Sequence, residues 1–593
     1  MDKQPCTIPG LLAHRARTTP DDTAFYHKQS HGWQAITWTG FYRKALCLAR
    51  ALAGSGLGPG DVLAVLLPNT PEWEQAQHGG FLAGCTVAGL DMNDSRERLN
   101  TLLKMLRPKA LVVMAVDDIP GQTGPLPPSI RLILTAAPGS GTTYAQDLAP
   151  GRTVRISGLD GFAADPPDTA LPGVTEDQDA VRIFTSGTTG PPKSIGFTHG
   201  QLVFAATTIS DLLHPFLPAR ARSACWLPLS GPFQRMINYC GLIMNARTFL
   251  VADPRQVVSL AREIQPHFMA GVPRFYEKLH DGIQHELNRR PNIVRQLIAR
   301  CEALCMADDQ SRQAGRPISP VRAGLCVLAR ALVFRGIRKI LGGHIRFLFN
   351  GSAPLSPAIA RVLTAWGWPL LDAYGVSENI LPMAMNTPAR KSLGSVGIPL
   401  PGNTIRIARD GEILVKGKGV AKTGMPLTRD GYLKTGDTGI LDPNGFLYLN
   451  GRKADTFKLS TGRKIAPQDM ETALKTIPGV DHGVISGAGK KYTTALLNIT
   501  DRAWQSRVAA AGAPALARQC LYEDIRQACQ SFPAYARPKA VAIVHTPFGI
   551  DTGELTPSLK VRRRFVLEKY AHEPANCCHH GNGTPRAKIK KEE

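Results

Sequence analysis

A loop rich in hydroxyl groups follows an apolar strand near residue 183. The segment from Ile183 to Ser194 reads IFTSGTTGPPKS and carries five hydroxyl side chains, two glycines and one lysine. Its glycines let backbone N–H groups come close to an anion, and its lysine adds a compact positive charge. Pro192 occupies the place where the nucleotide loop of P-loop NTPases has glycine, so the loop is not of that type. A solvated linker has a similar composition, so other motifs must decide.

Two later segments offer groups that suit a purine nucleotide. The first reads NGSAPL over residues 350–355, and the second reads DAYGVSEN over residues 372–379. Tyr374 has a flat ring on which a purine can stack. Glu378 supplies a hard oxygen ligand of the kind that Mg²⁺ prefers. Both segments are also typical of the turns on either side of a helix, and the two interpretations are compatible.

Three segments near the C-terminus complete the series. They read YLKTGDTG over 432–439, GRKADTFKL over 451–459 and GELTPSLKVRR over 553–563. A carboxylate such as Asp437 can accept hydrogen bonds from two vicinal hydroxyls, although it is equally typical of a turn. Lys560, beside a run of arginines, would on its own indicate a solvated basic face. The order of the motifs along the chain favours a functional role for both.

These ordered motifs resemble those of the adenylate-forming enzymes, which include acyl-CoA synthetases, peptide-synthetase adenylation domains and luciferases. The resemblance covers nearly the whole chain. It implies that ATP and AMP are bound by Thr185, Ser186, Gly187, Thr188, Thr189, Gly190, Lys193, Gly351, Ser352, Ala353, Asp372, Ala373, Tyr374, Gly375, Ser377, Asp437 and Arg452.

The resemblance also assigns roles in the chemistry. Lys560 closes over the acyl carboxylate and the α-phosphate, and Glu378 and Thr185 hold Mg²⁺, so these three are the expected catalytic residues. Asp437 and Arg452 hold the ribose hydroxyls. The same resemblance places the hinge between two domains at Asp455 and CoA binding at Lys458 and Gly462.

Two segments are most similar to those of long-chain fatty acyl-CoA synthetases. They read WLPLSGPFQR over 226–235 and GVPRFYEK over 271–278. The first departs from the family pattern, because Gly231 replaces a histidine and Gln234 replaces a glutamate. We expect Trp226, Gly231 and Phe233 to line the acyl pocket. Without an imidazole at position 231 the pocket should accept long chains, of roughly twelve carbons or more, or acids that are bulky near the carboxylate, because each buried methylene adds about 0.8 kcal/mol. The alternative is that Phe233 or Trp226 fills the space and the selectivity is ordinary.

The expected fold class is α/β. Apolar runs alternate with amphipathic segments, which predicts a parallel sheet. Specific expectations are helices over 11–17, 39–55 and 75–84, strands over 62–67 and 110–116, a mostly helical stretch over 275–341, and a helix over 356–366 capped by Ser356. The resemblance implies a large N-terminal domain of paired α/β subdomains with a small distorted β-barrel, followed by a small mobile α+β domain.

The length of 593 residues exceeds the usual size of one hydrophobic core. We therefore expect an adenylation domain over 1–454 and a lid domain over 455–570. Residues 571–593 form a polar, basic tail, which we expect to be disordered.

The formal net charge of +23 indicates anionic partners. The phosphates of ATP and CoA fit this charge, and so does an anionic membrane surface. No helix-turn-helix, zinc-finger or RNA-binding signature is present, so nucleic acid is not expected. The sequence has no apolar run of membrane-spanning length and no signal-peptide pattern at its start, which predicts a cytoplasmic protein, with peripheral contact at the inner membrane surface left open. The sequence also leaves open whether the protein forms a homodimer.

The resemblance thus implies an ATP- and Mg²⁺-dependent ligase that converts a long-chain fatty acid to acyl-AMP and then, with coenzyme A, to acyl-CoA. Two alternatives remain. One is an acyl-AMP ligase that passes the acyl group to a separate carrier protein. The other is a degenerate relative that binds nucleotide or acyl ligand without turnover, against which the retained Glu378, Asp437, Arg452 and Lys560 argue.

Overall fold

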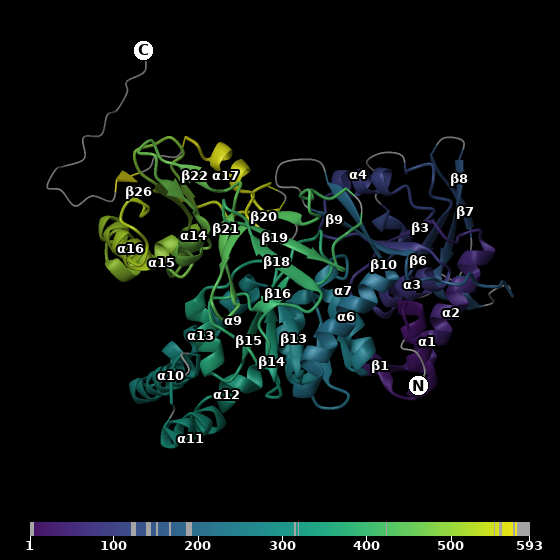
Figure 1. Ribbon diagram of the computed structural model, residues 1–593, viewed down its shortest axis with the longest axis horizontal. Coiled ribbons are helices and arrows are strands. Elements are labelled where there is room, and N and C mark those ends of the chain that lie inside the picture. Colours follow the sequence, from purple (N-terminus) through teal and green to yellow (C-terminus); the bar gives the residue numbers. More distant parts are fainter. Residues whose placement is uncertain are drawn as a thin grey trace, which may run out of the picture. The chain divides into compact units, whose positions relative to one another are not determined.

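Helices and strands alternate along the N-terminal part of the chain, as the sequence predicts (Figure 1). The computed structural model describes residues 5–119, 126–137, 144–149, 152–164, 168–185, 192–313, 316–317, 319–422, 424–550, 552–556, 560–572 and 576–577. The chain divides into two compact units. The first comprises Met1–Thr435 and Gly439–Leu449, and the second comprises Gly436–Thr438 and Asn450–Glu593.

The individually predicted elements are confirmed, with shifted ends. They are α1 (Ile8–Thr18), α2 (Trp38–Gly54), β3 (Val62–Leu66), α3 (Pro71–Leu82), β5 (Ala110–Val113) and α13 (Pro357–Ala365). One detail is wrong. Ser356 stands at the N-cap of α13, but its side chain accepts no capping hydrogen bond. Pro357, whose fixed φ suits the first turn of a helix, marks the start of α13.

A nine-stranded sheet forms one layer of the first unit. Its order is β17 (Ile398–Pro399), β16 (Ala384–Met385), β15 (Leu370–Tyr374), β14 (Phe347–Asn350), β13 (Phe268–Gly271), β11 (Arg222–Cys225), β12 (Arg247–Leu250), β1 (Thr23–Gln29) and β2 (Gly32–Thr37). The strands from β15 to β1 are parallel, and the others are antiparallel edges. Central strands such as β13 and β14 are buried throughout and almost entirely apolar, because both faces of the sheet are covered; Asn350, at the end of β14, is the exception.

An eight-stranded sheet forms the second α/β layer. Its order is β10 (Lys193–Thr198), β9 (Asp179–Thr185), β4 (Thr86–Gly89), β3, β5, β6 (Leu132–Thr135), β8 (Arg152–Gly158) and β7 (Tyr144–Ala149). All neighbours from β9 to β8 are parallel, and β10 and β7 close the two edges in antiparallel pairs. The two sheets are the paired α/β subdomains that the resemblance implies.

Helices cover both sheets and bury the largest side chains. Besides α1–α3 and α13 they are α4 (Arg96–Leu106), α5 (Leu159–Ala164), α6 (His199–Leu213), α7 (Pro232–Met244), α8 (Val257–Ile264), α9 (Pro273–Asn288), α10 (Asn292–Gln313), α11 (Pro320–Leu328) and α12 (Arg335–Arg338). One hydrophobic core joins residues of both sheets, among them Val65 of β3 and Phe249 of β12. The predicted helical stretch over 275–341 is confirmed as α9–α12, with a π turn at Ala329–Val333.

A smaller β element lies after the nine-stranded sheet in sequence. Its order is β18 (Asn403–Ile407), β19 (Glu412–Gly417), β20 (Leu433–Leu441) and β21 (Leu447–Arg452). Its apolar residues, including Ile413, Val415 and Leu433, form a separate small core with Tyr374. This sheet stands where the resemblance implies a small distorted barrel.

The second unit is α+β. It has a two-stranded hairpin of β22 (Phe457–Lys458) and β23 (Lys464–Ile465), and a sheet of β24 (His482–Ser486), β25 (Thr494–Asn498), β26 (Ala540–Val544) and β27 (Asn576–Cys577). Helices α14 (Gln468–Leu474), α15 (Asp501–Ala511) and α16 (Pro514–Ala528) build its core around Leu474, Leu497 and Leu521. Helix α17 (Arg563–Lys569) follows the segment that contains Lys560.

The expected tail over 571–593 lies outside the described residues, apart from 571–572 and β27. The pairing of β27 with β26 carries the sheet of the second unit past Tyr570. Among the described residues, no helix has both the length and the hydrophobicity needed to cross a membrane.

Candidate active site

Four of the predicted motifs follow neighbouring parallel strands of the nine-stranded sheet. The segments beginning at Trp226, Gly271, Gly351 and Tyr374 stand at the carboxyl ends of β11, β13, β14 and β15. The register pairs Gly271 with Asn350 and Asn350 with Asp372, so the strand ends lie level with one another. Ligands of open α/β sheets bind outside the carboxyl ends of the strands. Motifs up to about 150 residues apart thus meet at one edge.

The phosphate loop begins at the same kind of edge in the second sheet. Thr185 is the last residue of β9 and Lys193 the first of β10, and the two are cross-strand partners. The predicted residues Ser186, Gly187, Thr188, Thr189 and Gly190 lie outside the described residues. Strand β4, next to β9, ends near the motif that follows β11, because the hydroxyl of Ser230 lies 3.2 Å from a carboxylate oxygen of Asp91. The carboxyl edges of the two sheets therefore approach each other.

The turn after β14 has an unusual backbone. Ser352 has a φ of +72°, a backbone conformation that residues other than glycine rarely adopt. Such strain persists only where surrounding structure holds it, and it is found most often at functional sites. A Cβ on the preceding Gly351 would lie 3.1 Å from the ring of Phe233, so the turn packs tightly against the start of α7. Gly351 and Ser352 are both predicted nucleotide-binding residues.

Asn350 and Asp372 form a buried polar pair at the strand ends. The amide of Asn350 donates a 2.7 Å hydrogen bond to the carboxylate of Asp372. Burial raises the pKa of Asp372 to about 6, and the hydrogen bond from Asn350 opposes this rise. The side-chain oxygen of Asn350 is buried and accepts no hydrogen bond from the described residues. An acceptor in this state is suited to a donor group on a ligand, such as a purine amine.

Tyr374 is more deeply buried than a free stacking platform would be. Only 7% of its surface is exposed, and its ring packs against Ile413 and Leu433 in the small core. Ala373, Gly375 and Ser377 flank it along the chain. Its stacking on a purine stays a prediction.

Glu378 has the properties that a magnesium ligand requires. It is partly buried, and its carboxylate makes no hydrogen bond or ion pair with the part of the chain that the structure describes. Its backbone carbonyl accepts from the amide of Ala421 at 2.9 Å, which fixes the main chain at this point. A partly buried carboxylate without a partner among the described residues fits the predicted role of holding Mg²⁺. The side chain of Thr185, the other predicted ligand, lies outside the described part.

The predicted acyl-pocket residues lie at the start of α7 and just before it. The indole of Trp226 donates to the carbonyl of Ala270 at 2.7 Å and packs on Phe275 with ring centroids 4.8 Å apart. Gly231 is the N-cap of α7, and a Cβ built there meets only the carbonyl of Pro228, at an ordinary 3.5 Å. A side chain therefore fits at position 231. Phe233 links this region to the nucleotide motif through its contact with Gly351.

Asn69 and Gln234 hold the loop between β11 and α7. The amide of Asn69 donates to the carbonyl of Leu227 at 2.9 Å, and its oxygen accepts from the amide of Leu229 at 3.2 Å. Gln234 accepts from the amide of Leu227 at 3.3 Å and donates to Asn238 at 3.1 Å. An ionised glutamate could not make this donation. The glutamine that replaces the family's glutamate at position 234 thus makes a local hydrogen bond that a glutamate could not make.

A buried polar network between α3 and α7 escaped the sequence analysis. Glu74 accepts from Asn238 at 2.6 Å and from Gln77 at 3.0 Å, and Gln77 in turn accepts from Arg235 and Tyr239 at 2.8 and 2.7 Å. Burial raises the pKa of Glu74 to about 7, although Asn238 and Arg235 oppose the rise. Arg235 lies within a recognised motif, but nothing in the sequence pairs it with residues of α3.

The two predicted ribose ligands form an ion pair in the second unit. The guanidinium of Arg452 lies 3.2 Å from the carboxylate of Asp437, which is 9% exposed. Backbone hydrogen bonds fix both segments, since Lys453 donates to the carbonyl of Gly436 at 2.8 Å. Residues 437 and 452 are thus brought together as the resemblance implies, and ribose binding stays a prediction.

Lys560 stands at the end of a short closed loop. The amide of Lys560 donates to the hydroxyl of Thr556 at 3.0 Å, and its carbonyl accepts from the amide of Thr556 at 2.8 Å. Residues 557–559 are outside the described part. Lys560 is exposed, although the atoms around it partly desolvate its ammonium and lower its pKa; the positive charge of Arg452 lowers it further, and the negative charge of Asp437 opposes both. The two predicted ribose ligands, Asp437 and Arg452, therefore both influence the pKa of the predicted catalytic lysine.

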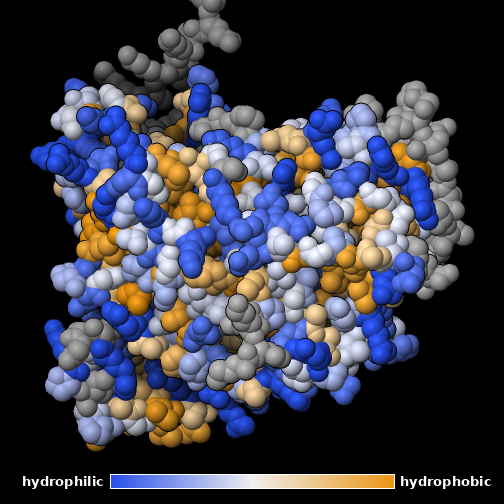
Figure 2. All heavy atoms as spheres, turned by 45° about the vertical axis from the view of Figure 1, so that its right-hand side comes forward, coloured by the Kyte–Doolittle hydropathy of each residue, from blue (hydrophilic) through white to orange (hydrophobic). Residues whose placement is uncertain are grey.

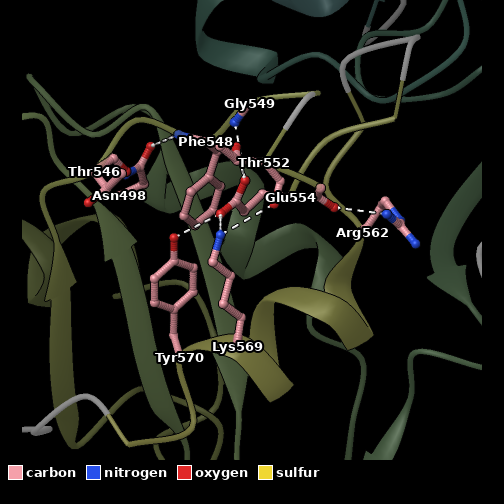
Figure 3. A network of polar contacts seen from close by, with 10 residues as sticks. Asn498, Thr546, Phe548, Gly549, Thr552, Glu554, Arg562, Lys569 and Tyr570 are labelled. Atoms are coloured by element: carbon pink, nitrogen blue, oxygen red, sulfur yellow. Dashed lines mark hydrogen bonds and ion pairs between the residues drawn. The ribbon is translucent and has the colours of Figure 1, made fainter. Parts of the chain in front are cut away.

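A fully buried carboxylate anchors the base of this loop (Figure 3). Glu554 accepts hydrogen bonds from the ammonium of Lys569 at 2.5 Å, the hydroxyl of Tyr570 at 2.9 Å and the hydroxyl of Thr552. Burial alone would raise the pKa of Glu554, but these donors hold it down at about 2. The carbonyl of Glu554 also accepts from the amide of Arg562 at 2.7 Å. The sequence motif contains Glu554, but its anchoring role is visible only in the structure.

The predicted hinge and CoA residues follow in the second unit. Asp455 lies in a turn, where its amide donates to the carbonyl of Arg452 at 3.2 Å. Lys458 is exposed on β22. Gly462 has a φ of +79° in the tight connection from β22 to β23, and no atom lies within 4 Å of a Cβ built there. The open space at Gly462 is compatible with a ligand arm passing close to the backbone.

Comparisons with known proteins identify the family of the chain. A family model described as AMP-binding enzyme matches residues 12–423, and one described as AMP-binding enzyme C-terminal domain matches residues 454–577. The chain is 27% identical to the long-chain-fatty-acid–CoA ligase FadD15 of Mycobacterium bovis, over 95% of this chain and 96% of the relative.

Two solved structures are similar in fold. The adenylation domain of a carboxylate reductase from Mycobacterium chelonae superposes with a TM-score of 0.74 at 19% identity, covering 96% of this chain and 91% of that one. The o-succinylbenzoate coenzyme A synthetase MenE of Bacillus subtilis, in complex with ATP and a magnesium ion, superposes with a TM-score of 0.65 at 21% identity, covering 93% of this chain and 98% of that one.

Proposed function

Because the chain belongs to the AMP-binding enzyme family, we propose that it is an ATP-dependent fatty acid–CoA ligase with a preference for long acyl chains. Full-length similarity to a long-chain-fatty-acid–CoA ligase supports the reaction class. The observation that carries the proposal is the meeting of four motifs at the carboxyl edge of β11, β13, β14 and β15.

In the proposed first step, the carboxylate of the fatty acid attacks the α-phosphate of ATP. Acyl-adenylate forms and pyrophosphate leaves. Mg²⁺, when bound with ATP, supplies positive charge to the phosphates, and Glu378 is the described residue suited to hold it. Lys560 offsets the repulsion between the incoming carboxylate and the phosphate, which is an electrostatic and positioning task.

In the proposed second step, the thiol of CoA attacks the acyl carbonyl of the adenylate. A C–S bond forms, the bond from the carbonyl carbon to the phosphate oxygen breaks, and AMP leaves. We propose that the second unit turns about Asp455 between the steps, so that Lys560 withdraws and the connection containing Gly462 takes its place. Rotation of this kind lets one site serve two reactions.

The proposed function is tested by the products. Purified protein is incubated with ATP, Mg²⁺, CoA and a panel of fatty acids of different lengths, and acyl-AMP and acyl-CoA are measured by mass spectrometry. The proposal requires acyl-CoA, with long acids preferred. Acyl-AMP without acyl-CoA would indicate transfer to a separate carrier protein. The absence of both products with every acid would contradict the proposed activity.

We expect Glu378→Gln to raise the Mg²⁺ concentration needed for adenylation and to lower its maximal rate. The amide keeps the shape of the side chain but loses the charge that a hard cation prefers. The free energy of unfolding should change little, because the carboxylate makes no hydrogen bond or ion pair with the described residues. The measurement is ATP–pyrophosphate exchange across a magnesium titration. A titration curve identical to that of the wild type would remove Glu378 from the metal site.

We expect Gly231→His to shift the optimum of kcat/KM toward shorter or slimmer acids. A side chain fits locally at this N-cap, so the fold should tolerate the change. The added ring would occupy volume beside the proposed acyl pocket, and each methylene excluded there costs about 0.8 kcal/mol. Chain-length profiles of both proteins provide the measurement, with Gly282→Ala, at an open position of α9, as the control. Identical profiles would show that residue 231 does not line the pocket.

The partners and location of the protein belong to the same proposal. We propose fatty acid and CoA as substrates and the cytoplasm as the site of action. Contact with an anionic membrane would bring the enzyme to its apolar substrate, and a homodimer stays a possible assembly.

A further inference from the structure

An apolar stripe runs along α11 and the π turn that follows it. Its members recur at intervals of four, three and four residues and are between 47% and 72% exposed; they are Val321, Leu325, Leu328 and Leu332. The opposite side of the same segment is buried through Cys326 and Ala329. A helix of a globular protein normally turns such a stripe toward the core. Here a second apolar face points outward.

Helix α10 adds to the same surface region. Ile293 and Leu297, one helical turn apart, are 78% and 51% exposed. The thiol of Cys326 lies 3.8 Å from the carbonyl of Leu304, so α10 and α11 pack side by side as a helical hairpin. The hairpin lies at the lower end of Figure 1, and the same end of Figure 2 shows hydrophobic surface beside hydrophilic surface.

The segment that contains the hairpin and its two flanks is strongly basic; α10, α11 and their connection alone carry five arginines and three carboxylates. Eleven arginine or lysine residues and three carboxylates lie between Arg289 and Lys339, which gives a formal net charge of +8. Eight of the basic residues are exposed; they are Arg289, Arg290, Arg295, Arg300, Arg312, Arg316, Arg335 and Lys339. The exposed leucines and valine of α11 and the π turn thus belong to the same segment as the exposed arginines of α10 and its flanks.

The three carboxylates of the hairpin are all engaged away from the surface. Glu302 accepts from the indole of Trp366 at 2.6 Å. Asp308 is 1% exposed and pairs with Arg312 at 3.0 Å, and Asp309 lies 3.6 Å from Lys391. The exposed Glu286, just before this segment, pairs with Arg289 at 3.2 Å. The apolar stripe is therefore bordered mainly by positive charge.

We propose that the hairpin of α10 and α11 docks the protein on an anionic lipid surface. The apolar stripe would enter the headgroup region, while the arginines pair with lipid phosphates, a combination typical of helices that lie in a membrane interface. A second copy of the chain fits less well, since a symmetric contact would bring two copies of this basic segment together. The inference goes beyond the proposed ligase activity, and its test needs no turnover.

The test is sedimentation of the full-length protein with vesicles. We expect binding to phosphatidylcholine vesicles that contain phosphatidylglycerol, weaker binding at high salt, and little binding to phosphatidylcholine alone. Leu328→Ser with Leu332→Ser should lower the affinity for the anionic vesicles by about tenfold or more. Arg295→Gln with Arg300→Gln should lower it and reduce its salt dependence.

The matched control is Leu427→Ser with Leu516→Ser, which removes two leucines of similar exposure outside the hairpin. It should bind vesicles like the wild type. Circular dichroism and the midpoint of thermal unfolding show that each variant is folded. Equal vesicle binding by the wild type and the Leu328/Leu332 variant would overturn the proposal, as would equal loss in the control. So would light scattering that finds a wild-type dimer and a monomeric Leu328/Leu332 variant, because a second copy would then cover the stripe.

Discussion

Replacing Lys560 with alanine should abolish acyl-adenylate formation while leaving thioester formation from supplied acyl-adenylate largely intact. The lysine lies in the electrostatic environment of Asp437 and Arg452, and we propose that it faces the carboxylate and α-phosphate only during the first step. One charge-assisted contact at a developing charge is worth a few kcal/mol, so the loss should be about a hundredfold or more. The measurements are ATP–pyrophosphate exchange and acyl-CoA release from acyl-adenylate.

The control for this prediction is Arg564→Ala. Arg564 is also a cation close to Lys560 in sequence, but it is exposed, and among the described residues its ion pair is with Glu568, one helical turn away. Its removal should leave both half-reactions near the wild-type rate. Pyrophosphate exchange at the wild-type rate in Lys560→Ala would show that the lysine has no part in adenylation. Equal loss in both half-reactions would indicate a structural defect instead of a role in one step.

Replacing Glu554 with alanine should destabilise the second unit and slow adenylation as a consequence. The carboxylate is fully buried and holds Lys569, Tyr570 and Thr552 at the base of the Lys560 loop. Removing one partner of a buried ion pair typically costs about 3–5 kcal/mol. We expect a lower Tm and faster hydrogen exchange in β26 and α17. Glu568→Ala, which removes an exposed carboxylate from an ion pair on α17, should change stability by less than about 1 kcal/mol.

The contribution of Glu554 should depend on pH. Its pKa in the folded protein is held at about 2, below the ordinary value of a glutamate, so the unfolded chain takes up the proton first as the pH falls. The stabilisation is therefore complete above the ordinary glutamate pKa and is lost between that value and about 2. The difference in free energy of unfolding between the wild type and Glu554→Gln should shrink over this acid range. A difference that stays constant on acidification would contradict the proposed anchoring by the charged form.

Residues close together in sequence could be assigned without the structure. The segment over 183–194 is predicted to bind phosphate because hydroxyls, glycines and a lysine occur within twelve positions. Pro357 and the spacing of apolar residues predict the helix after Ser356, and a continuous apolar run predicts β3. These signals are local because dihedral preferences and hydrophobic periodicity act over a few residues. The N-cap position of Ser356 is also predicted, but its hydroxyl makes no capping hydrogen bond in the structure.

Contacts between distant residues could not be assigned in this way. Glu74 and Asn238 are 164 residues apart. Phe233 lies against Gly351 because the segments that follow β11 and β14 leave the same edge of the nine-stranded sheet. Glu554 has the sequence signature of an ordinary motif residue, and its partners become visible only when α17 folds back on it. The outward stripe of α11 reads in the sequence like any amphipathic helix, because periodicity does not tell which face is buried.

The sequence by itself determined the family resemblance, the α/β class and the order of the motifs, because each depends on residue types at short spacing. The tertiary structure decided which motifs meet, which carboxylates are compensated and which apolar faces stay exposed. Glu378 and Glu554 illustrate the division, since both are motif glutamates in the sequence. Among the described residues the first makes no ion pair or hydrogen bond and the second accepts several, and this difference follows from burial and long-range packing.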